Sequence, residues 1–322
     1  MNTGKIVPIA YPDTFVKYSE VGFQKNILSA FGLGRNGYIK AGHALLLLIE
    51  NSTGIVQYFD FGRYVTPFGK GRVRSAKTDV ELVIPLKAQI NSNGDVTNIE
   101  EILIWLEARP HRTHGDGRLV ASVCHEVNYE KAINFINDLQ SQGSVPYKTF
   151  GNIGSNCSRL VTDSMIHSLT DNKIKKLLIR NSKFTPSPLG NVDKGANGGN
   201  IYSVYKGKVS LYKKSVLKEN LTNYFDSNTP VENKEVLPKR VGNKQLLEGI
   251  GASAYFEITY TDNEYHISRC DYNLKEDFKG VFTVDKYGFD INQEYKFVYD
   301  CNCNYCHIEQ HGTKYRFNVV VD

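Results

Sequence analysis

The chain has 322 residues, a formal net charge of +5, 41% hydrophobic residues and 23% charged residues. These values are typical of a soluble globular protein. The basic residues are scattered rather than gathered on one segment, which argues against nucleic acid as a partner. No stretch reaches the roughly 20 apolar residues of a membrane span, and the N-terminus lacks the layout of a signal peptide. We therefore expect a cytoplasmic protein without a membrane span.

The first predicted elements form a β-hairpin within residues 41–65. Two apolar runs, GHALLLLIE and IVQYFDFGRY, flank a polar turn at residues 51–54, a pattern typical of antiparallel strands. If the turn centres on residues 52 and 53, His43 faces Gly62 and has Asp60 as a diagonal neighbour on the same face. A register shifted by one residue would place Gln57 on that face instead.

The middle of the chain predicts further strands and helices in no βαβ order. Strands are expected over Val80–Ala88 and over residues 119–127. Thr97 and Glu100 have the spacing of a capping box, so a helix is expected from Thr97 up to Pro110. Apolar residues at helical spacing predict another helix around 132–139, and the loop 151–156 leads into a helix over 157–169. This mixture predicts the α+β class.

The composition changes near residue 184. The stretch at 185–199, TPSPLGNVDKGANGG, is rich in Gly and Pro and poor in apolar residues, which is typical of a linker or a long loop. Residues 200–240 resemble partly helical connecting material. From Leu246 onward, short strands alternate with turns and predict an antiparallel β module. The expected organisation is a first domain at 1–183, a linker at 184–240 and a small β domain of unknown role at 241–322.

Cys157 has the placement of a nucleophilic thiol. It follows Ser155 and Asn156, either of which can cap the predicted helix, and the N-terminus of a helix lowers the pKa of a thiol there. His43 begins a strongly apolar strand directly after Gly42, where a small residue permits close approach to the backbone. Taken singly, both side chains have a common structural interpretation, because a lone cysteine is usually a small buried hydrophobe.

The Gly-His strand start, GHALLLLIE, and the Asn-Cys-Ser helix start, GSNCSRLV, together resemble the permuted papain-like superfamily. This is the NlpC-type and lecithin:retinol acyltransferase-like group, in which the histidine strand precedes the cysteine helix. The resemblance covers roughly residues 35–170. It implies a circularly permuted papain-like domain, with Cys157 as nucleophile, His43 as base and a third polar residue on the strand that follows. Asp60 suits this third position, and Gln57 is the alternative.

These residues predict a cysteine-dependent hydrolase or acyltransferase that acts on an amide or ester through an acyl-enzyme. Such catalysis requires no cofactor, and the resemblance implies peptide-like or lipid-like substrates. The backbone N–H of Cys157 and the side chain of Asn156 are candidate oxyanion donors. The alternative is a non-catalytic binding protein that uses the papain-like fold as a scaffold and the C-terminal β domain to recognise a partner.

A basic loop at residues 109–118 is a second candidate region. Arg109, His111 and Arg112 are candidates to contact an anionic part of a substrate, and a solvated turn is the alternative. The loop also holds His114 and Asp116, but its spacing matches no common zinc pattern.

A cysteine-rich segment near the C-terminus is a candidate metal site. Four potential ligands of a structural zinc ion lie close together in the sequence: Cys301, Cys303, Cys306 and His307. Reduced cysteines in a surface loop are the alternative. The CxxC spacing lacks the βαβ context of a redox enzyme.

Overall fold

The computed structural model describes residues 1–17, 35–148, 154–182, 186–230 and 236–320. Part of the predicted loop, residues 151–153, and the start of the predicted linker, residues 184–185, lie outside these ranges. The chain divides into two compact units. The first comprises Met1–Phe61, Ile84–Ser141 and Lys148–Glu232, and the second comprises Gly62–Val83, Gln142–Tyr147 and Asn233–Asp322. In the described ranges, no helix has the length and apolar character that a membrane crossing requires.

An antiparallel sheet forms the framework of the first unit. Its strand order is β11-β10-β7-β1-β4-β5, and β8 also pairs with β1. The strands are β1 (Gly4–Tyr11), β4 (His43–Glu50), β5 (Val56–Gly62), β7 (Leu119–Ser122), β8 (Cys124–Val127), β10 (Ile201–Tyr205) and β11 (Lys208–Leu211). A separate ribbon pairs β2 (Val16–Lys17) with β3 (Tyr38–Ile39).

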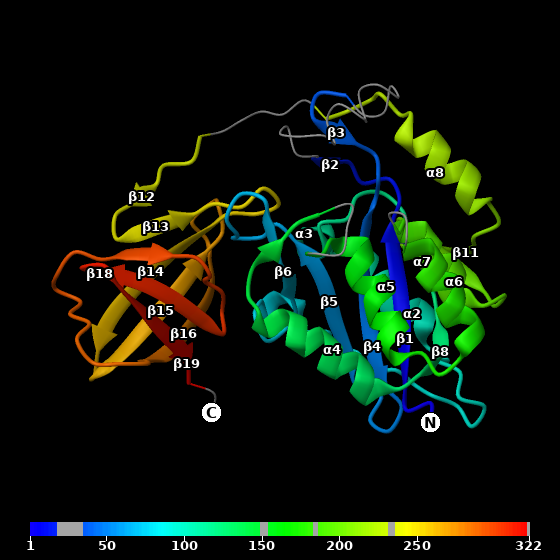
Figure 1. Cartoon of the computed structure of the whole chain (residues 1–322), viewed down its shortest axis with the longest axis horizontal. Coiled ribbons are helices and arrows are strands. Elements are labelled where there is room, and N and C mark those ends of the chain that lie inside the picture. The colour runs from blue at the N-terminus through cyan, green and yellow to red at the C-terminus, as the bar shows by residue number, and fades with distance from the viewer. Residues whose placement is uncertain (18–34, 149–153, 183–185, 231–235, 321–322) are drawn as a thin grey trace. The chain divides into compact units, whose positions relative to one another are not determined.

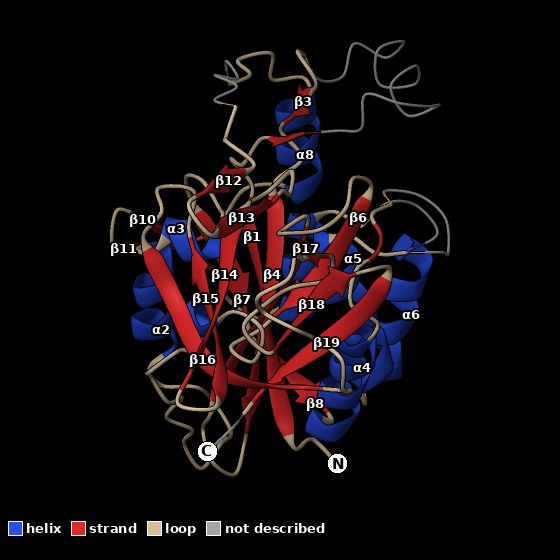
Figure 2. Cartoon of the chain, turned by 90° about the vertical axis from the view of Figure 1, so that its left-hand side faces the viewer, coloured by secondary structure: helices blue, strands red, loops and turns tan. Residues whose placement is uncertain are grey.

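Helices cover both faces of this sheet. In Figures 1 and 2, α4, α5 and α6 lie on one face and α2 lies on the other. The helices of the unit are α2 (Ile99–Glu107), α3 (Pro110–Thr113), α4 (Tyr129–Ser141), α5 (Cys157–Ser168), α6 (Asn172–Ser182), α7 (Pro188–Ala196) and α8 (Val216–Tyr224). Because the central strands are covered on both sides, all of β1 and all but the last residue of β4 are buried. This explains the continuous apolar run in β4.

The predicted hairpin and its register are confirmed. Strands β4 and β5 pair antiparallel, with Leu45 opposite Asp60 and Leu47 opposite Tyr58. Alternate residues of a strand point to the same face, so His43 shares its face with Leu45 and Asp60. Gln57 is opposite Leu48 and therefore lies on the other face.

The predicted strand over Val80–Ala88 is wrong. A short 3-10 helix occupies Val80–Leu82, and the following residues form no strand. Pro85 lacks the N–H group that a central strand needs. Leu82 is buried while Val83 is half-exposed, so the run does not form a continuous buried strand.

Both ends of the helix predicted from Thr97 differ from expectation. Helix α2 begins after Asn98, and no side chain caps it. Instead, Thr97 and Asn98 bind the preceding segment: the Thr97 hydroxyl donates to the backbone carbonyl of Gln89, and the Asn98 side-chain oxygen accepts from the backbone N–H of Gln89. Pro110 follows the end of α2 and begins α3 at a position where its missing N–H costs nothing.

The segment predicted as a linker instead contributes folded elements to the first unit. Ser187 caps α7, with its hydroxyl accepting from the Gly190 N–H at 2.9 Å. Leu189 and Val192 of this helix are buried against Ala10 of β1, and β10 extends the sheet through β7. The glycines permit close packing rather than a free chain, because a Cβ atom on Gly195 would lie 2.7 Å from a Pro8 side-chain atom.

The predicted C-terminal β module is confirmed as a curled antiparallel sheet in the second unit. Its strand order is β12-β13-β14-β15-β16-β19-β18-β17. The strands are β12 (Arg240–Val241), β13 (Lys244–Leu247), β14 (Ala254–Thr261), β15 (Glu264–Cys270), β16 (Glu276–Val284), β17 (Lys296–Val298), β18 (Tyr305–Gln310) and β19 (Thr313–Val319). Strands β6 (Lys70–Arg74) and β9 (Val145–Pro146) of this unit pair with each other.

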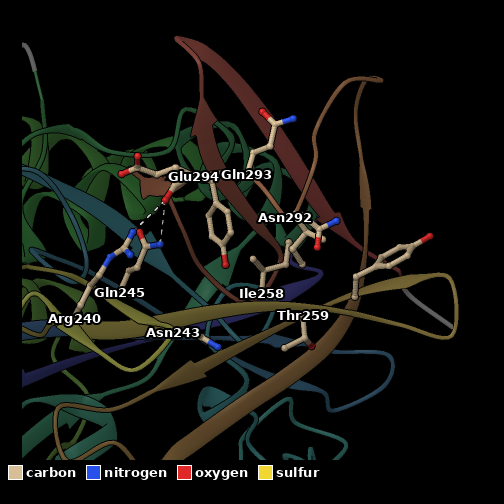
Figure 3. Close-up of a pocket in the computed structure, with 11 residues that line it drawn as sticks. Arg240, Asn243, Gln245, Ile258, Thr259, Asn292, Gln293 and Glu294 are labelled. Atoms are coloured by element: carbon tan, nitrogen blue, oxygen red, sulfur yellow. Dashed lines mark hydrogen bonds between the residues drawn. The ribbon is translucent and has the colours of Figure 1, made fainter.

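Side chains join the two ends of the curled sheet. The Gln245 side chain accepts from the N–H of Phe297 at 3.0 Å and donates to the carbonyl of Tyr295 at 3.3 Å. Arg240 donates to the same carbonyl at 3.2 Å, and Figure 3 shows these two side chains converging on it. The hydrogen bonds of the Gln245 side chain thus take the place of backbone hydrogen bonds between β13 and the segment that leads into β17. A hollow of about 630 Å³ lies beside this seam.

Candidate active site

Cys157 is the first residue of α5, as the sequence predicts. The Asn156 side chain caps the helix by accepting from the Arg159 N–H at 2.9 Å, and its amide donates to the Lys148 carbonyl at 2.8 Å. Because the cap fixes the first turn, the Cys157 thiol is held at the end where unpaired N–H groups concentrate. Asn156, predicted as a candidate oxyanion donor, thus has a structural role in which its carbonyl oxygen and its amide both take part.

Removing this cap should destabilise the first unit. We expect Asn156→Ala to lower the free energy of unfolding by about 1 kcal/mol, because the Arg159 N–H loses its acceptor. Asn156→Ser keeps an acceptor oxygen for this N–H and should lose less. Urea unfolding of the two variants beside the wild type measures the difference. Equal stability of the alanine variant and the wild type would show that the cap contributes nothing.

His43 begins β4 next to this helix end. Gly42 precedes it with φ at +76°, and a Cβ atom there would lie 3.1 Å from the Tyr11 carbonyl oxygen. Glycine is therefore required for the chain to enter the strand at this point. His43 lies opposite Tyr11 of β1 in the register, and its imidazole is close enough to the Cys157 thiol for the two groups to interact electrostatically.

Asp60 lies on the other side of the imidazole. Its carboxylate oxygen Oδ2 is 3.8 Å from Nε2 of His43, a distance that permits an ion pair but exceeds a hydrogen bond. Among the described residues, Nε2 has no hydrogen-bond partner, although it is buried. Asp60 is fully buried, and the Tyr58 hydroxyl donates to the same Oδ2 at 2.7 Å. The three side chains therefore lie in the order cysteine, histidine, aspartate.

The electrostatics of the site favour a charged cysteine and histidine. Burial by itself raises the pKa of the Cys157 thiol, but the His43 imidazole and the backbone of Ala44 and Ser158 stabilise the thiolate and bring its pKa below the ordinary value. Burial likewise opposes the charged imidazole, yet Asp60 and Cys157 raise the pKa of His43 to about 9. By contrast, burial raises the pKa of Cys124 to about 12.

Two contributors to the site were not predicted from the sequence. Tyr58 orients the Asp60 carboxylate, and Ala44 contributes its backbone to the environment of the sulfur. The parity of β5 is a signal that could have found Tyr58, because residues 58 and 60 share a face. The sequence holds no signal for the contribution of Ala44, because that contribution comes from its backbone and not from its side chain.

The basic loop packs against Tyr11 of β1, close to the candidate active site. Arg109 and Arg112 lie over the Trp105 ring, at 4.1 and 5.5 Å from its centroid, and His111 is exposed. Further along, Gly115 packs so closely on Tyr11 that a Cβ atom would lie 2.2 Å from the ring. Since Tyr11 is opposite His43, the loop reaches the strand end that carries the histidine, while Arg109 and Arg112 contact α2.

The cysteine-rich segment in the second unit does not converge on one point. His307 directs Nδ1 to the Asp300 carbonyl at 2.8 Å, and Cys303 lies in the electrostatic environment of Arg269 and Asp79. In the part of the chain that the structure describes, no group of three or more His, Cys, Asp and Glu side chains is placed to hold a metal ion. The zinc site at Cys301, Cys303, Cys306 and His307 remains a prediction.

In the first unit, a cysteine, a histidine and an aspartate side chain lie side by side at one strand end of a helix-flanked antiparallel sheet. The chain is therefore a mixed α and β protein with a thiol site. The sequence profile of the type VI secretion system effector TseH-like family matches residues 6–174, a range that contains all three side chains. The chain belongs to this family.

The other comparisons concern the C-terminal part and the fold. A profile described as the DUF6695 C-terminal domain matches residues 244–320, which correspond to the curled sheet. The crystal structure of the type VI secretion system effector TseH aligns with 19% sequence identity and a TM-score of 0.42, over 66% of this chain and 99% of that one. No curated protein matches the chain.

Proposed function

We propose that the protein is a cysteine-dependent hydrolase that cleaves an amide or ester through an acyl-enzyme on Cys157. The observation that carries the proposal is the contact of the thiol with His43, whose other side faces the buried Asp60 at 3.8 Å. The resemblance to permuted papain-like proteins supports the same assignment of roles. Membership of a family of secretion effectors favours a substrate outside the producing cell rather than the cytoplasmic setting expected from the sequence.

The chemistry follows from the order of the side chains. The Cys157 thiolate attacks the carbonyl carbon, and the Cys157 N–H at the helix end is a donor for the oxyanion. The protonated His43 gives its proton to the leaving amine or alcohol. Because Nε2 faces Asp60, Nδ1 is the nitrogen that serves the reaction. A water molecule, or another acceptor in an acyl transfer, then attacks the acyl-enzyme with His43 as base.

The state of the thiol can be tested without knowledge of the substrate. We expect iodoacetamide to modify Cys157 of the folded protein at least about tenfold faster than Cys124 at pH 6.5, because a thiol of lowered pKa carries more thiolate there. The rate should begin to rise at a lower pH than for a free thiol with a pKa of about 8.5. Peptide mass spectrometry of time points gives the two rates within one sample.

A small uncharged methanethiosulfonate reagent serves as a second probe, since Cys157 is 7% exposed. The proposal fails if both reagents modify Cys157 no faster than a free cysteine, or if His43→Ala leaves the rate unchanged.

A further inference from the structure

Two cysteines of the second unit meet at the base of one loop. The loop connects β17 and β18, whose closing pair is Val298 and His307. Cys301 lies near the start of the loop and Cys306 lies at its end, in β18. Both are 0% exposed and belong to the same hydrophobic core cluster. All six cysteines of the chain are free thiols in this structure.

Reciprocal contacts hold the two sulfur atoms together. Sγ of Cys301 accepts from the N–H of His307 at 3.3 Å, and His307 directly follows Cys306. Sγ of Cys306 donates to the carbonyl of Asn302 at 3.4 Å, and Asn302 directly follows Cys301. Each sulfur thus contacts the backbone next to the other cysteine, and the two thiols interact electrostatically.

The loop between them is fixed by its own hydrogen bonds. The Asn302 side chain accepts from the N–H groups of Asn304 and Tyr305 at 2.8 and 3.1 Å. The Asn302 N–H donates to the Tyr305 carbonyl at 2.8 Å. The backbone therefore already brings the two cysteines together, and bond formation requires little rearrangement.

The neighbouring cysteine is not part of this pair. The N–H of Cys303 donates to the Thr78 carbonyl at 3.0 Å, and burial raises the pKa of its thiol to about 12. The Cys306 thiol interacts more strongly with the Cys301 thiol than with the Cys303 thiol, so the CxxC spacing of Cys303 and Cys306 is not the pairing that the fold selects.

We propose that Cys301 and Cys306 form a site of reversible disulfide modification, oxidised by exchange with a small-molecule disulfide. One protein thiolate attacks a sulfur of the oxidant and releases one thiol, giving a mixed disulfide. The second protein thiolate displaces the other thiol and closes the bond. Two electrons and two protons pass to the reagent, so oxidised glutathione yields two molecules of glutathione.

Burial controls how fast this exchange occurs. Both sulfur atoms belong to residues that are 0% exposed, so the oxidant does not reach them in the closed loop. The exchange therefore requires a brief opening of the loop and, because a thiolate attacks, accelerates with rising pH. Once formed, the bond closes a short loop and restricts the unfolded chain.

The test uses the full-length Cys157→Ala protein, in which the active-site thiol cannot react. After reduction and incubation with oxidised glutathione at pH 8, we expect a mass loss of about 2 Da. Fragmentation of the peptide 297–314 should place the bond between Cys301 and Cys306, with Cys303 alkylated. The melting temperature of the second unit should rise by roughly 5 °C and return after reduction.

Single substitutions provide the controls. Cys303→Ser should keep the mass loss, whereas Cys301→Ser should abolish it and leave a glutathione adduct on Cys306. If Cys301→Ser does not fold, the peptide map of the oxidised Cys157→Ala protein shows which two cysteines form the bond. A bond that involves Cys303, no bond after oxidation at pH 8, or one tightly held zinc ion per chain would overturn the proposal. None of these outcomes bears on the proposed chemistry at Cys157.

Discussion

The Cys157→Ala protein should be acetylated by 4-nitrophenyl acetate at least about 1000-fold more slowly than the wild type. This activated ester acylates a reactive thiol whatever the natural substrate is. Alanine removes the sulfur that forms the acyl bond, so no other group at the helix end can replace it. The wild type should show a burst of nitrophenol and carry one acetyl group on Cys157, which intact and peptide mass spectrometry detect.

His43→Ala should slow the acetylation of Cys157 roughly 100-fold, because the thiol then lacks both the proton acceptor and the positive charge that stabilises its thiolate. Cys124→Ala is the matched control, since it removes a buried cysteine of the same unit away from His43 and should leave the burst unchanged. Acetylation of several cysteines at similar rates, or a burst that survives in Cys157→Ala, would refute the assignment of the nucleophile.

The largest stability effect is expected from Asp79→Ala in the second unit. Asp79 binds Arg72 through two hydrogen bonds of 2.6 and 2.8 Å and binds Arg269 at 2.9 Å. All three side chains are almost fully buried. Without the carboxylate, the buried Arg72 would lose the ion pair that compensates its charge, while Arg269 would still bind Glu81 and Asp277. Leaving a buried charge without its partner costs about 3–5 kcal/mol in comparable cases.

Urea unfolding of the second unit should show this loss in Asp79→Ala. Glu81→Gln is the control, because Glu81 binds the same Arg269 at 2.7 Å but is 30% exposed, and we expect a change below about 1 kcal/mol. If the two variants are equally stable, the buried cluster does not stabilise the unit.

The same cluster should make the second unit sensitive to acid. Burial opposes the charge on Asp79, but Arg72 and Arg269 hold its pKa well below the ordinary value. A lowered pKa in the folded state adds stability above the unfolded pKa of about 3.9, and this stability is lost as the pH falls further. The wild type should therefore lose more stability than Asp79→Ala when the pH is lowered from 5 to 3.

The sequence determined the local parts of the fold and site. The two apolar runs and the polar turn at 51–54 predicted the β4–β5 hairpin, and a turn centred on residues 52 and 53 predicted the register that the structure has. The sequence left Gln57 as an alternative to Asp60, and the observed register places Asp60 on the face of His43 and Gln57 on the other. Asn156 before Cys157 predicted a capped helix start, since this cap depends on residues within one turn.

Only the tertiary structure decided which distant segments meet. It brought Cys157 of α5 against His43 of β4, and it recruited Tyr58 to hold Asp60. It made a helix and a sheet extension of the Gly-rich and Pro-rich stretch after residue 185, where burial against β1 outweighed weak local propensity. It also placed the Cys306 thiol against Cys301 rather than against Cys303, its CxxC neighbour, because the closing pair of the β17–β18 loop, and not the spacing of the cysteines, decides which sulfur atoms come close.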